Sequence, residues 1–218
     1  MIKIIKKEKI GEINQQKVWD EVESSFEPLD TVKDFLKNKK GFILDLGCGN
    51  GKNFVKSKGE NEIKYLGVDF SKKQLSVAEK YAIEIGVDFE LVKCGIDNLP
   101  NSWDEKFDYG LFIGSLHCLN NSEKRKKAVK EFYRVLKKEG EGFVSVWNSK
   151  DKRFNCVNNK GDIYMNWMKN KKEYFRYYYL FEKEEFLKLL EDAGFKVLEF
   201  VNYKDRFSRK NWTIKVKK

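Results

Sequence analysis

Three glycines and two aspartates carry the clearest chemical signal in the sequence. The stretch LDLGCGNG places Gly47, Gly49 and Gly51 directly after an apolar run, with Asp45 two residues before the first glycine. Glycines permit a sharp turn and a close backbone approach to a ligand, and a helix that follows offers unpaired N–H groups. Asp69 lies about twenty residues further on, where an acid meets ribose hydroxyl groups in nucleotide-binding α/β folds. The pattern predicts a site for a nucleotide-like cofactor.

Other catalytic motifs fit the chain poorly. A dinucleotide fingerprint GxGxxG requires glycine at position 52, where the chain has Lys52, and the P-loop pattern GxxxxGK[ST] is not formed either. The stretch GSLHC contains Ser115 and His117, but the GxSxG motif of serine hydrolases is absent and no triad acid can be assigned. Asp69 alone could simply stabilise the N-terminus of a helix. The combination of residues carries the cofactor prediction.

Apolar runs alternate with helical patterns and would position these residues. Strands are expected at 41–46, 64–70, 87–94, 107–114 and 142–148. Helices are expected at 71–86, 122–138 and 182–195, after further helices within about 11–38, and a terminal strand pair at 196–203 and 211–218. Ser71 and Gln74 predict a capping box, and Gly86 a helix end. Alternating strands and helices favour a parallel sheet covered on both faces.

Composition limits the possible functions. The 218 residues suit one domain, and a single histidine with four scattered cysteines excludes a multi-histidine metal site, so no metal is expected. No long apolar run or secretory signal is present, which predicts a cytoplasmic protein with reduced, mostly buried cysteines and no membrane segment. The net charge of +10 has two explanations, a lysine-rich surface of no functional meaning or a polyanionic partner. Charge alone does not decide between them.

The glycine turn with Asp45 and Asp69 closely resembles the S-adenosylmethionine site of class I methyltransferases, over about residues 41–148. The resemblance implies a Rossmann-like α/β fold in a single domain, with a seven-stranded, mostly parallel sheet, an antiparallel last strand and helices on both faces. It implies S-adenosylmethionine as cofactor. The residues that would bind it are Asp45, Gly47, Cys48, Gly49, Gly51, Asp69, Phe70, Ile96 and Ile113. One departure is Gly95, which stands where family members usually carry an acid for the adenine.

The distal half is similar to the methyltransferases that esterify 5-carboxymethyluridine at the tRNA wobble position. The stretches that carry this resemblance occur in the order SLHCLNNSEKR, SVWN, DIYMNW, FRYYYLF and RKNWTIKV. They match the family at His117, Glu123, Arg125, Trp147, Asp162, Trp167, Arg176 to Tyr179, Asn211 and Trp212. Cys118 and Tyr179 stand where the family often has histidine. The domain would consist of N-terminal helices (1–40), a cofactor-binding core (41–148), a substrate-side insertion without clear periodicity (149–181) and a C-terminal helix with a strand pair (182–218).

The implied acceptor is a carboxylate, which is already ionised at neutral pH, so no general base is obligatory. The enzyme must instead orient the acceptor and exclude water. The resemblance assigns this task to His117, Arg176, Tyr177 and Tyr178, through carboxylate binding or stacking on the base. Further substrate contacts are expected from Trp147, Asn148, Arg153, Trp167, Asn211 and Trp212. Arg153 and nearby lysines would contact phosphates of the anticodon loop.

Three alternatives remain open from sequence alone. The protein could methylate a small-molecule acid or amine, with the aromatic run covering the pocket, or it could be a catalytically idle RNA-binding subunit. The run RYYY could also be an ordinary buried strand, with the tryptophans in the core and His117 satisfying a local hydrogen bond. Members of the tRNA family commonly work with a small zinc-binding activator subunit, and the strand KYLGVDF (64–70) could offer the apolar edge that such a partner needs.

Overall fold

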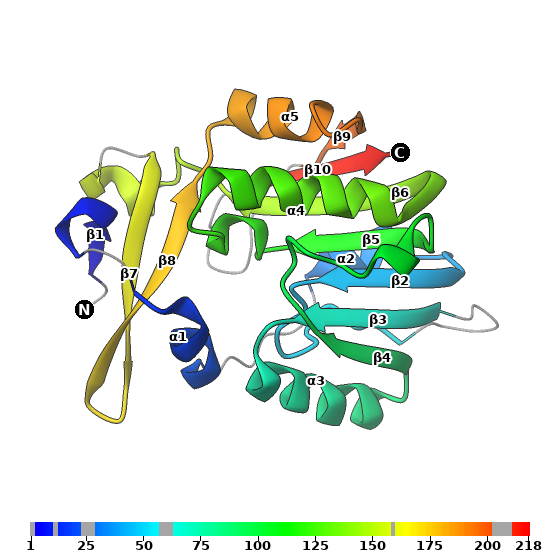
Figure 1. Cartoon of the computed structure of the whole chain (residues 1–218), viewed down its shortest axis with the longest axis horizontal. Coiled ribbons are helices and arrows are strands. Elements are labelled where there is room, and N and C mark those ends of the chain that lie inside the picture. Colours follow the sequence, from blue (N-terminus) through cyan, green and yellow to red (C-terminus); the bar gives the residue numbers. More distant parts are fainter. Residues whose placement is uncertain (1–2, 11–12, 23–28, 57–62, 158–159, 202–210) are drawn as a thin grey trace.

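The computed structural model describes residues 3–10, 13–22, 29–56, 63–157, 160–201 and 211–218 (Figure 1). The strands are β1 (Ile4–Lys6), β2 (Gly41–Leu46), β3 (Ile63–Asp69), β4 (Asp88–Lys93), β5 (Phe107–Ile113), β6 (Leu136–Trp147), β7 (Gly161–Lys169), β8 (Lys172–Leu180), β9 (Lys196–Phe200) and β10 (Asn211–Lys217). The α-helices are α1 (Gln15–Glu21), α2 (Asp30–Leu36), α3 (Lys72–Ile85), α4 (Ser122–Val135) and α5 (Lys183–Glu191). Short 3-10 segments are η1 (Lys7–Lys9), η2 (Asn101–Trp103), η3 (Leu116–Cys118) and η4 (Lys152–Val157).

The large sheet has seven strands in the order β4-β3-β2-β5-β6-β10-β9. Strands β4, β3, β2, β5 and β6 run parallel, and β10 is antiparallel to both β6 and β9. The predicted fold class is therefore confirmed, with its antiparallel last strand. Because the carboxyl ends of the parallel strands meet at one edge, the loops that follow β2, β3, β5 and β6 lie together there.

Helices cover both faces of the large sheet, as the buried strands require. Leu44 of β2 packs with Phe132 of α4 and Phe186 of α5 on one face. Ile43, its neighbour in the strand, packs with Phe35 of α2 and Ala78 of α3 on the other face. Successive side chains of a strand point to opposite faces, so one buried strand supplies both cores.

One expected helix end and one expected helix cap differ in the structure. Helix α4 ends at Val135 rather than at 138, because Leu136 already pairs with Phe107 as the first residue of β6. The capping box is only half formed. The Ser71 hydroxyl accepts from the backbone amide of Gln74 at 3.1 Å, as a capping box requires. The Gln74 side chain does not bind back to Ser71 and instead donates to the Val22 carbonyl at 2.6 Å.

The strand KYLGVDF is not an edge. As β3 it lies between β2 and β4 and is hydrogen-bonded on both sides, so it cannot receive a partner's strand. The outer strands of the large sheet are β4 and β9. The expected position of an activator subunit is therefore corrected.

Residues 149–181 show no clear periodicity in the sequence, but much of the segment is the hairpin β7–β8, and the alternative that RYYY lies in a strand is confirmed. With β1 it forms a three-stranded antiparallel sheet in the order β1-β7-β8. The hairpin turn is Asn170-Lys171, with φ of 48° and 63° between the paired residues Lys169 and Lys172. Two-residue hairpin turns favour positive φ and usually carry glycine, which is absent here. In Figure 1 this small sheet stands beside the carboxyl ends of the large-sheet strands.

None of the described helices is long and apolar enough to cross a membrane.

Candidate active site

The turn after β2 requires glycine for two reasons, its backbone conformation and the lack of room for a side chain. Gly47, Gly49 and Gly51 have φ of +76°, +54° and +77°, which L side chains rarely adopt. A Cβ on Gly47 would lie 2.3 Å from the Cβ of Ser115, and the Ser115 hydroxyl donates to the Leu46 carbonyl at 2.6 Å. The turn therefore fits tightly between the ends of β2 and β5, with room only for glycine at its first position.

Asp69 ties this turn to the next helix. Its Oδ2 accepts from the Gly49 amide and its Oδ1 from the Ser71 amide, both at 2.9 Å. Burial raises the pKa of Asp69, while these amide hydrogen bonds lower it. Each carboxylate oxygen keeps further acceptor capacity, so the group can still bind hydroxyl groups of a ligand.

Asp45 is fully buried near the turn. The Asn53 amide donates to both of its oxygens at 3.2 Å. Burial raises its pKa to about 7, so near neutrality the carboxyl group is poised between its two protonation states. A cation that binds beside it would favour the charged form.

The other residues predicted for the cofactor lie at or just after the ends of β2, β3, β4 and β5. Cys48 is buried against Gly67, where an added Cβ would lie 2.9 Å from its sulfur atom. Ile96 and Ile113 are buried in the two apolar clusters, and Phe70 is half-buried after Asp69. At Gly95, where the family acid is missing, an added Cβ would lie 3.0 Å from Asp97 Oδ1. The Asp97 carboxylate thus lies close to the position where family members carry the acid.

The substrate side begins with an aromatic cluster. Tyr178 of β8 stacks on Trp147 at the end of β6, with ring centroids 4.0 Å apart and an interplanar angle of 29°. His117 of η3 stacks on the same indole at 5.0 Å and lies 5.7 Å from the Tyr178 ring. Three predicted residues, from η3, β6 and β8, are thus brought together.

His117 is a neutral imidazole. It is 2 % exposed, and burial lowers its pKa to about 3. Its Nδ1 accepts from the Trp147 amide at 3.3 Å, which places the proton of the neutral ring on Nε2. The arrangement suits a residue that donates one hydrogen bond and positions a neighbour, not one that abstracts a proton.

Arg176 lies on the same face of β8 as Tyr178. Its guanidinium carbon is 5.7 Å from the Tyr178 ring centroid and 5.9 Å from that of Trp19 in α1. Its Nε is buried and, within the described part of the chain, has no hydrogen-bond partner. A buried donor without a partner is costly, which makes this atom a candidate for binding an acceptor.

Tyr177 points the other way, so the structure does not bring it to Arg176 and Tyr178. Its hydroxyl donates to Asp162 and accepts from Arg125 at 3.2 Å, and burial raises its pKa. The expectation of one clamp made of three consecutive residues is therefore revised. Alternation along a strand separates Tyr177 from its neighbours.

The remaining substrate-side residues are largely engaged with the protein. Arg153 pairs with Asp151 at 3.1 Å, and its guanidinium lies 5.0 Å over the Trp147 ring. The guanidinium is therefore engaged within the protein and not, as had been expected, directed outward to RNA phosphates. The Asn148 side chain accepts from the Lys150 amide at 2.7 Å. The Trp212 indole donates to the Phe181 carbonyl at 3.0 Å.

Asn211 and Trp167, also predicted for the substrate, are less fully engaged with the protein. Asn211 pairs in register with Trp147, and its Oδ1 is buried without a partner in the described part of the chain. Trp167 contacts Tyr174 near the hairpin turn, at a ring distance of 5.7 Å. Tyr174 and Arg176 share a face of β8, so Trp167 continues the row formed by Tyr178 and Arg176 toward the turn.

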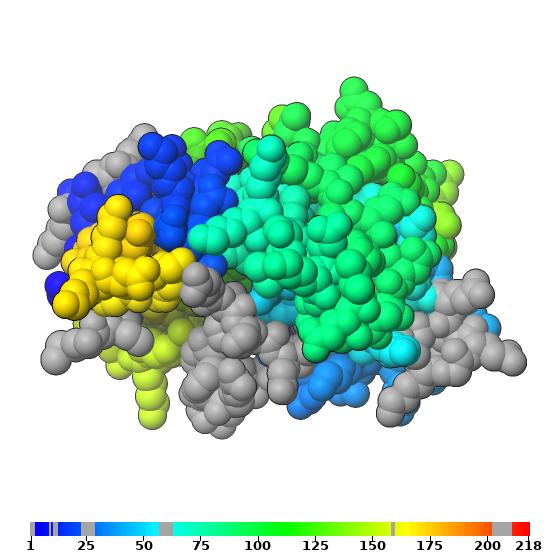
Figure 2. Space-filling view, turned by 90° about the horizontal axis from the view of Figure 1, so that it is seen from below, coloured from blue at the N-terminus to red at the C-terminus, as the bar shows by residue number. Residues whose placement is uncertain are grey.

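A helix was expected in the region of α1, but the role that α1 has at the site was not. The Gln15 amide donates to the Phe175 carbonyl at 3.2 Å and accepts from the Tyr177 amide at 2.8 Å, so it satisfies the outer edge of β8 as a neighbouring strand would. At the other end of α1, Asp20 accepts from the Ser71 hydroxyl at 2.5 Å. In Figure 2, α1 (blue) adjoins both the hairpin (yellow) and α3 (cyan to green). The helix links the cofactor loop to the substrate strand.

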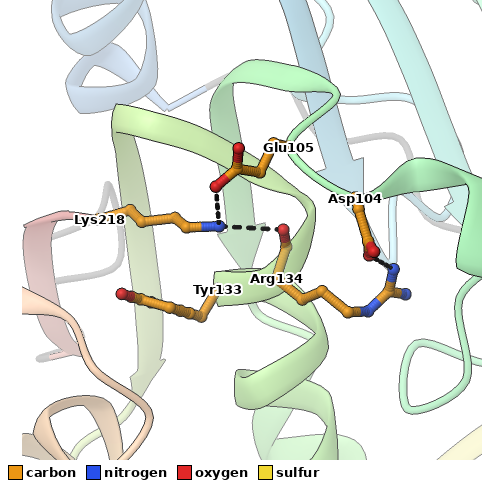
Figure 3. A pocket seen from close by; sticks show the side chains of 5 residues that line it. All are labelled: Asp104, Glu105, Tyr133, Arg134 and Lys218. Carbon is orange, nitrogen blue, oxygen red and sulfur yellow. Dashed lines mark hydrogen bonds and ion pairs between the residues drawn. The ribbon is translucent and has the colours of Figure 1, made fainter.

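A surface pocket of about 510 Å³ is lined by Asp104, Glu105, Tyr133, Arg134 and Lys218 (Figure 3). It lies at the opposite edge of the large sheet, where β5 begins and β10 ends. Its charged groups bind one another: Arg134 pairs with Asp104, and the Lys218 ammonium pairs with Glu105 at 3.4 Å. It is remote from the glycine turn and presents no free reactive group.

Comparison with known proteins agrees with this geometry. Residues 43–140 match a methyltransferase-domain family. A protein of Encephalitozoon cuniculi named as a methyltransferase is 31 % identical over 172 residues, covering 76 % of each chain. The tRNA (carboxymethyluridine(34)-5-O)-methyltransferase of Schizosaccharomyces pombe is 27 % identical over 217 residues, covering 88 % of each. A solved S-adenosylmethionine-dependent methyltransferase of Methanosarcina mazei superposes with a TM-score of 0.70 at 20 % identity, covering 88 % of this chain and 99 % of the other.

The fold is thus that of the class I S-adenosylmethionine-dependent methyltransferases. The chain belongs to the methyltransferase family, and S-adenosylmethionine is the cofactor of this class. The predicted family, fold class and cofactor are confirmed.

Substitution of Asp69 by alanine is expected to weaken binding of S-adenosylhomocysteine by roughly 10- to 100-fold, the cost of losing hydrogen bonds to a charged group. Calorimetric titration measures the change. Asp88→Asn, an exposed carboxylate at the start of β4, serves as the control and should leave the affinity within about twofold. Equal weakening in both variants would contradict the assignment of Asp69.

Affinity for S-adenosylhomocysteine should also depend on pH through Asp45. The cofactor's ammonium group favours the ionised carboxylate, so below a pKa of about 7 binding must displace a proton. The dissociation constant is expected to rise as pH falls below 7, by up to about tenfold per pH unit, and to be flat above it. Asp45→Asn should remove this dependence; a variant that keeps the same pH profile would exclude Asp45 as its source.

Proposed function

We propose that this methyltransferase esterifies the carboxylate of 5-carboxymethyluridine at the wobble position of tRNA. The observation that carries the proposal is Arg176: a guanidinium with a buried Nε lacking a described partner, beside stacked aromatic rings, on a strand at the carboxyl edge of the large sheet. An arginine fork matches a carboxylate, and aromatic rings match an extruded base. The similarity to the Schizosaccharomyces pombe enzyme, over most of both chains, supports the same substrate.

The residues of the glycine turn fit S-adenosylmethionine. The positive φ of Gly47 and Gly49 allows a close approach of the backbone, and the Asp69 carboxylate is the acceptor for ribose hydroxyls. Asp45 lies where a cationic amino group would be stabilised, with Cys48 and Gly51 completing the turn. Phe70, Ile96 and Ile113 supply apolar surface for adenine, and Asp97 replaces the acid missing at Gly95. Bound there, the cofactor supplies an electrophilic methyl group on a sulfonium.

The acceptor chemistry needs no base. A carboxylate oxygen held by Arg176 would accept the methyl group that the cofactor would supply, and the electrons of the C–S bond would stay on the cofactor's sulfur. The products are the methyl ester and S-adenosylhomocysteine, and no proton is released. A neutral His117 that is difficult to protonate is compatible with such a reaction, whereas a general-base mechanism would gain little from it.

The protein's task is then orientation. Arg176 holds the acceptor carboxylate, and the cluster of Tyr178, Trp147 and His117 fixes the rings against which the base is placed. Tyr177 and Trp212 are positioning residues that hold β8 and its connection to α5, and Asn148 joins that connection through a backbone bridge with Phe181. Asn211, with its unpartnered Oδ1 opposite Trp147, and Trp167 remain candidates for direct contact. Arg153 orients Trp147 and is not assigned to phosphate.

An activator subunit remains part of the proposal, at a different place. Strand β4 is an outer strand of the large sheet, and α3 packs beside it with Val77 and Ile83 exposed at 47 % and 66 %. An apolar partner would cover these side chains. If the chain alone is monomeric, soluble and fully active, no activator is needed.

The function is tested with labelled S-adenosylmethionine and tRNA treated with mild base, which regenerates carboxymethyluridine from its ester. Label recovered as base-labile methyl ester on that nucleoside, identified by mass, is the expected result. A small-molecule methyltransferase would instead label low-molecular-weight acids or amines and ignore added tRNA. Bound cofactor without labelled tRNA, with the activator present, would overturn the proposal.

Arg176→Ala is expected to lower kcat/KM for the tRNA substrate by roughly 10- to 100-fold, because the acceptor carboxylate loses a charged hydrogen-bond donor. Its affinity for S-adenosylhomocysteine should stay within about twofold. Tyr177→Phe is the matched comparison on the same strand. It removes a buried hydroxyl and should lower the free energy of unfolding by about 1–3 kcal/mol, while retaining most of the transfer activity. A larger loss of transfer in Tyr177→Phe than in Arg176→Ala would show that the acceptor binds on the Tyr177 face of β8, and it would contradict the assignment of Arg176.

A further inference from the structure

Two segments of the chain carry a clear surplus of positive charge. Residues 3–10 and 149–181 contain twelve Lys and Arg against four Asp and Glu, a net charge of +8 out of +10 for the whole protein. The remaining four fifths of the chain is therefore nearly neutral. Two other stretches, 122–138 and 196–218, are also basic, with a net charge of +6 each, and acidic stretches elsewhere offset them.

These segments are also neighbours in space. β1 from the first segment pairs with β7 from the second, and η4 packs against β1. Three of the four acids are already engaged: Glu173 pairs with Lys3 at 3.1 Å, Asp151 with Arg153, and Asp162 with the Tyr177 hydroxyl. The surplus thus belongs to one structural unit, the small sheet with η1 and η4.

The lysines of this unit lie at both ends of the hairpin. Lys171 and Lys172 are exposed at the turn, and Lys150, Lys152 and Lys160 are exposed around η4, at the other end. Strands of nine residues separate the two groups by about 30 Å, at about 3.3 Å per residue. Arg176 lies between them along β8. Figure 2 shows the hairpin (yellow) protruding at the surface beside the N-terminal segment (blue).

We propose that the small sheet is an RNA-binding surface, whose lysines at the hairpin turn and around η4 contact phosphates on either side of a base presented to Arg176. This rests on the proposed function and adds the location of the RNA. The partner is a folded RNA, because two basic groups about 30 Å apart match phosphates spread along a stem-loop rather than a compact anion.

The test is the affinity for an unmodified anticodon stem-loop, measured with the full chain by fluorescence anisotropy over a range of salt concentrations. The double variant Lys171→Glu/Lys172→Glu is compared with Lys37→Glu/Lys40→Glu, two exposed lysines at the opposite edge of the large sheet. Both change the net charge equally. The hairpin variant is expected to bind on the order of thirtyfold more weakly at 0.1 M salt, with the slope of log K against log salt smaller by roughly 1.5. The control should change by no more than about threefold.

Equal weakening in both variants, or no weakening in the hairpin variant, would overturn the proposed surface. Affinity for S-adenosylhomocysteine, measured in parallel, verifies that each variant is folded. Failure of the surface and failure of the proposed function give different results. Transfer to tRNA that survives the hairpin variant unchanged would refute the surface and leave the function standing. Stem-loop binding that depends on the hairpin, without any transfer to carboxymethyluridine, would refute the proposed function and leave the RNA-binding surface standing.

Discussion

One carboxylate, Asp69, joins the two loops that make the cofactor site. Because β2 and β3 are adjacent and parallel, the turn after β2 and the start of α3 arrive at the same point, and Asp69 binds an amide from each. Hydrogen bonds to a charged group contribute about 1.5–3 kcal/mol each, enough to fix the turn in the glycine conformation that it needs. The Gly47 and Cys48 amides also bind the Val68 carbonyl, so the turn is tied to the end of β3 at several points.

The same constraint extends to the substrate side through α1. Ser71, whose amide binds Asp69, donates its hydroxyl to Asp20 of α1, and Gln15 of the same helix satisfies the edge of β8. Strand β8 carries Arg176. Hydrogen bonds at the two ends of α1 therefore connect the Asp69 loop with the backbone on either side of Arg176, the residue that we assign to the acceptor carboxylate. Methyl transfer requires these two groups to be fixed relative to each other, and α1 is the element that does so.

The sequence was informative where a local pattern determines the structure. The alternation of strands and helices, the positive φ at Gly47, Gly49 and Gly51, and the end of α3 at Gly86 all follow from residue type. A strand at RYYY was only one alternative, and its pairing in the hairpin β7–β8 was not predicted because the turn is Asn-Lys without glycine. The direction of Tyr177 follows once β8 is known to be a strand. The role of Gln15 could not be predicted, because a side chain that pairs with a distant strand edge leaves no pattern in its own segment.

The most direct test is a crystal structure of the protein with S-adenosylhomocysteine and 5-carboxymethyluridine. Our account predicts the cofactor's ribose hydroxyls on Asp69 and the nucleoside carboxylate on the Arg176 guanidinium, with one carboxylate oxygen facing the sulfur atom. A carboxylate bound away from Arg176, or a nucleoside held on the face of β8 that carries Tyr177, would contradict it.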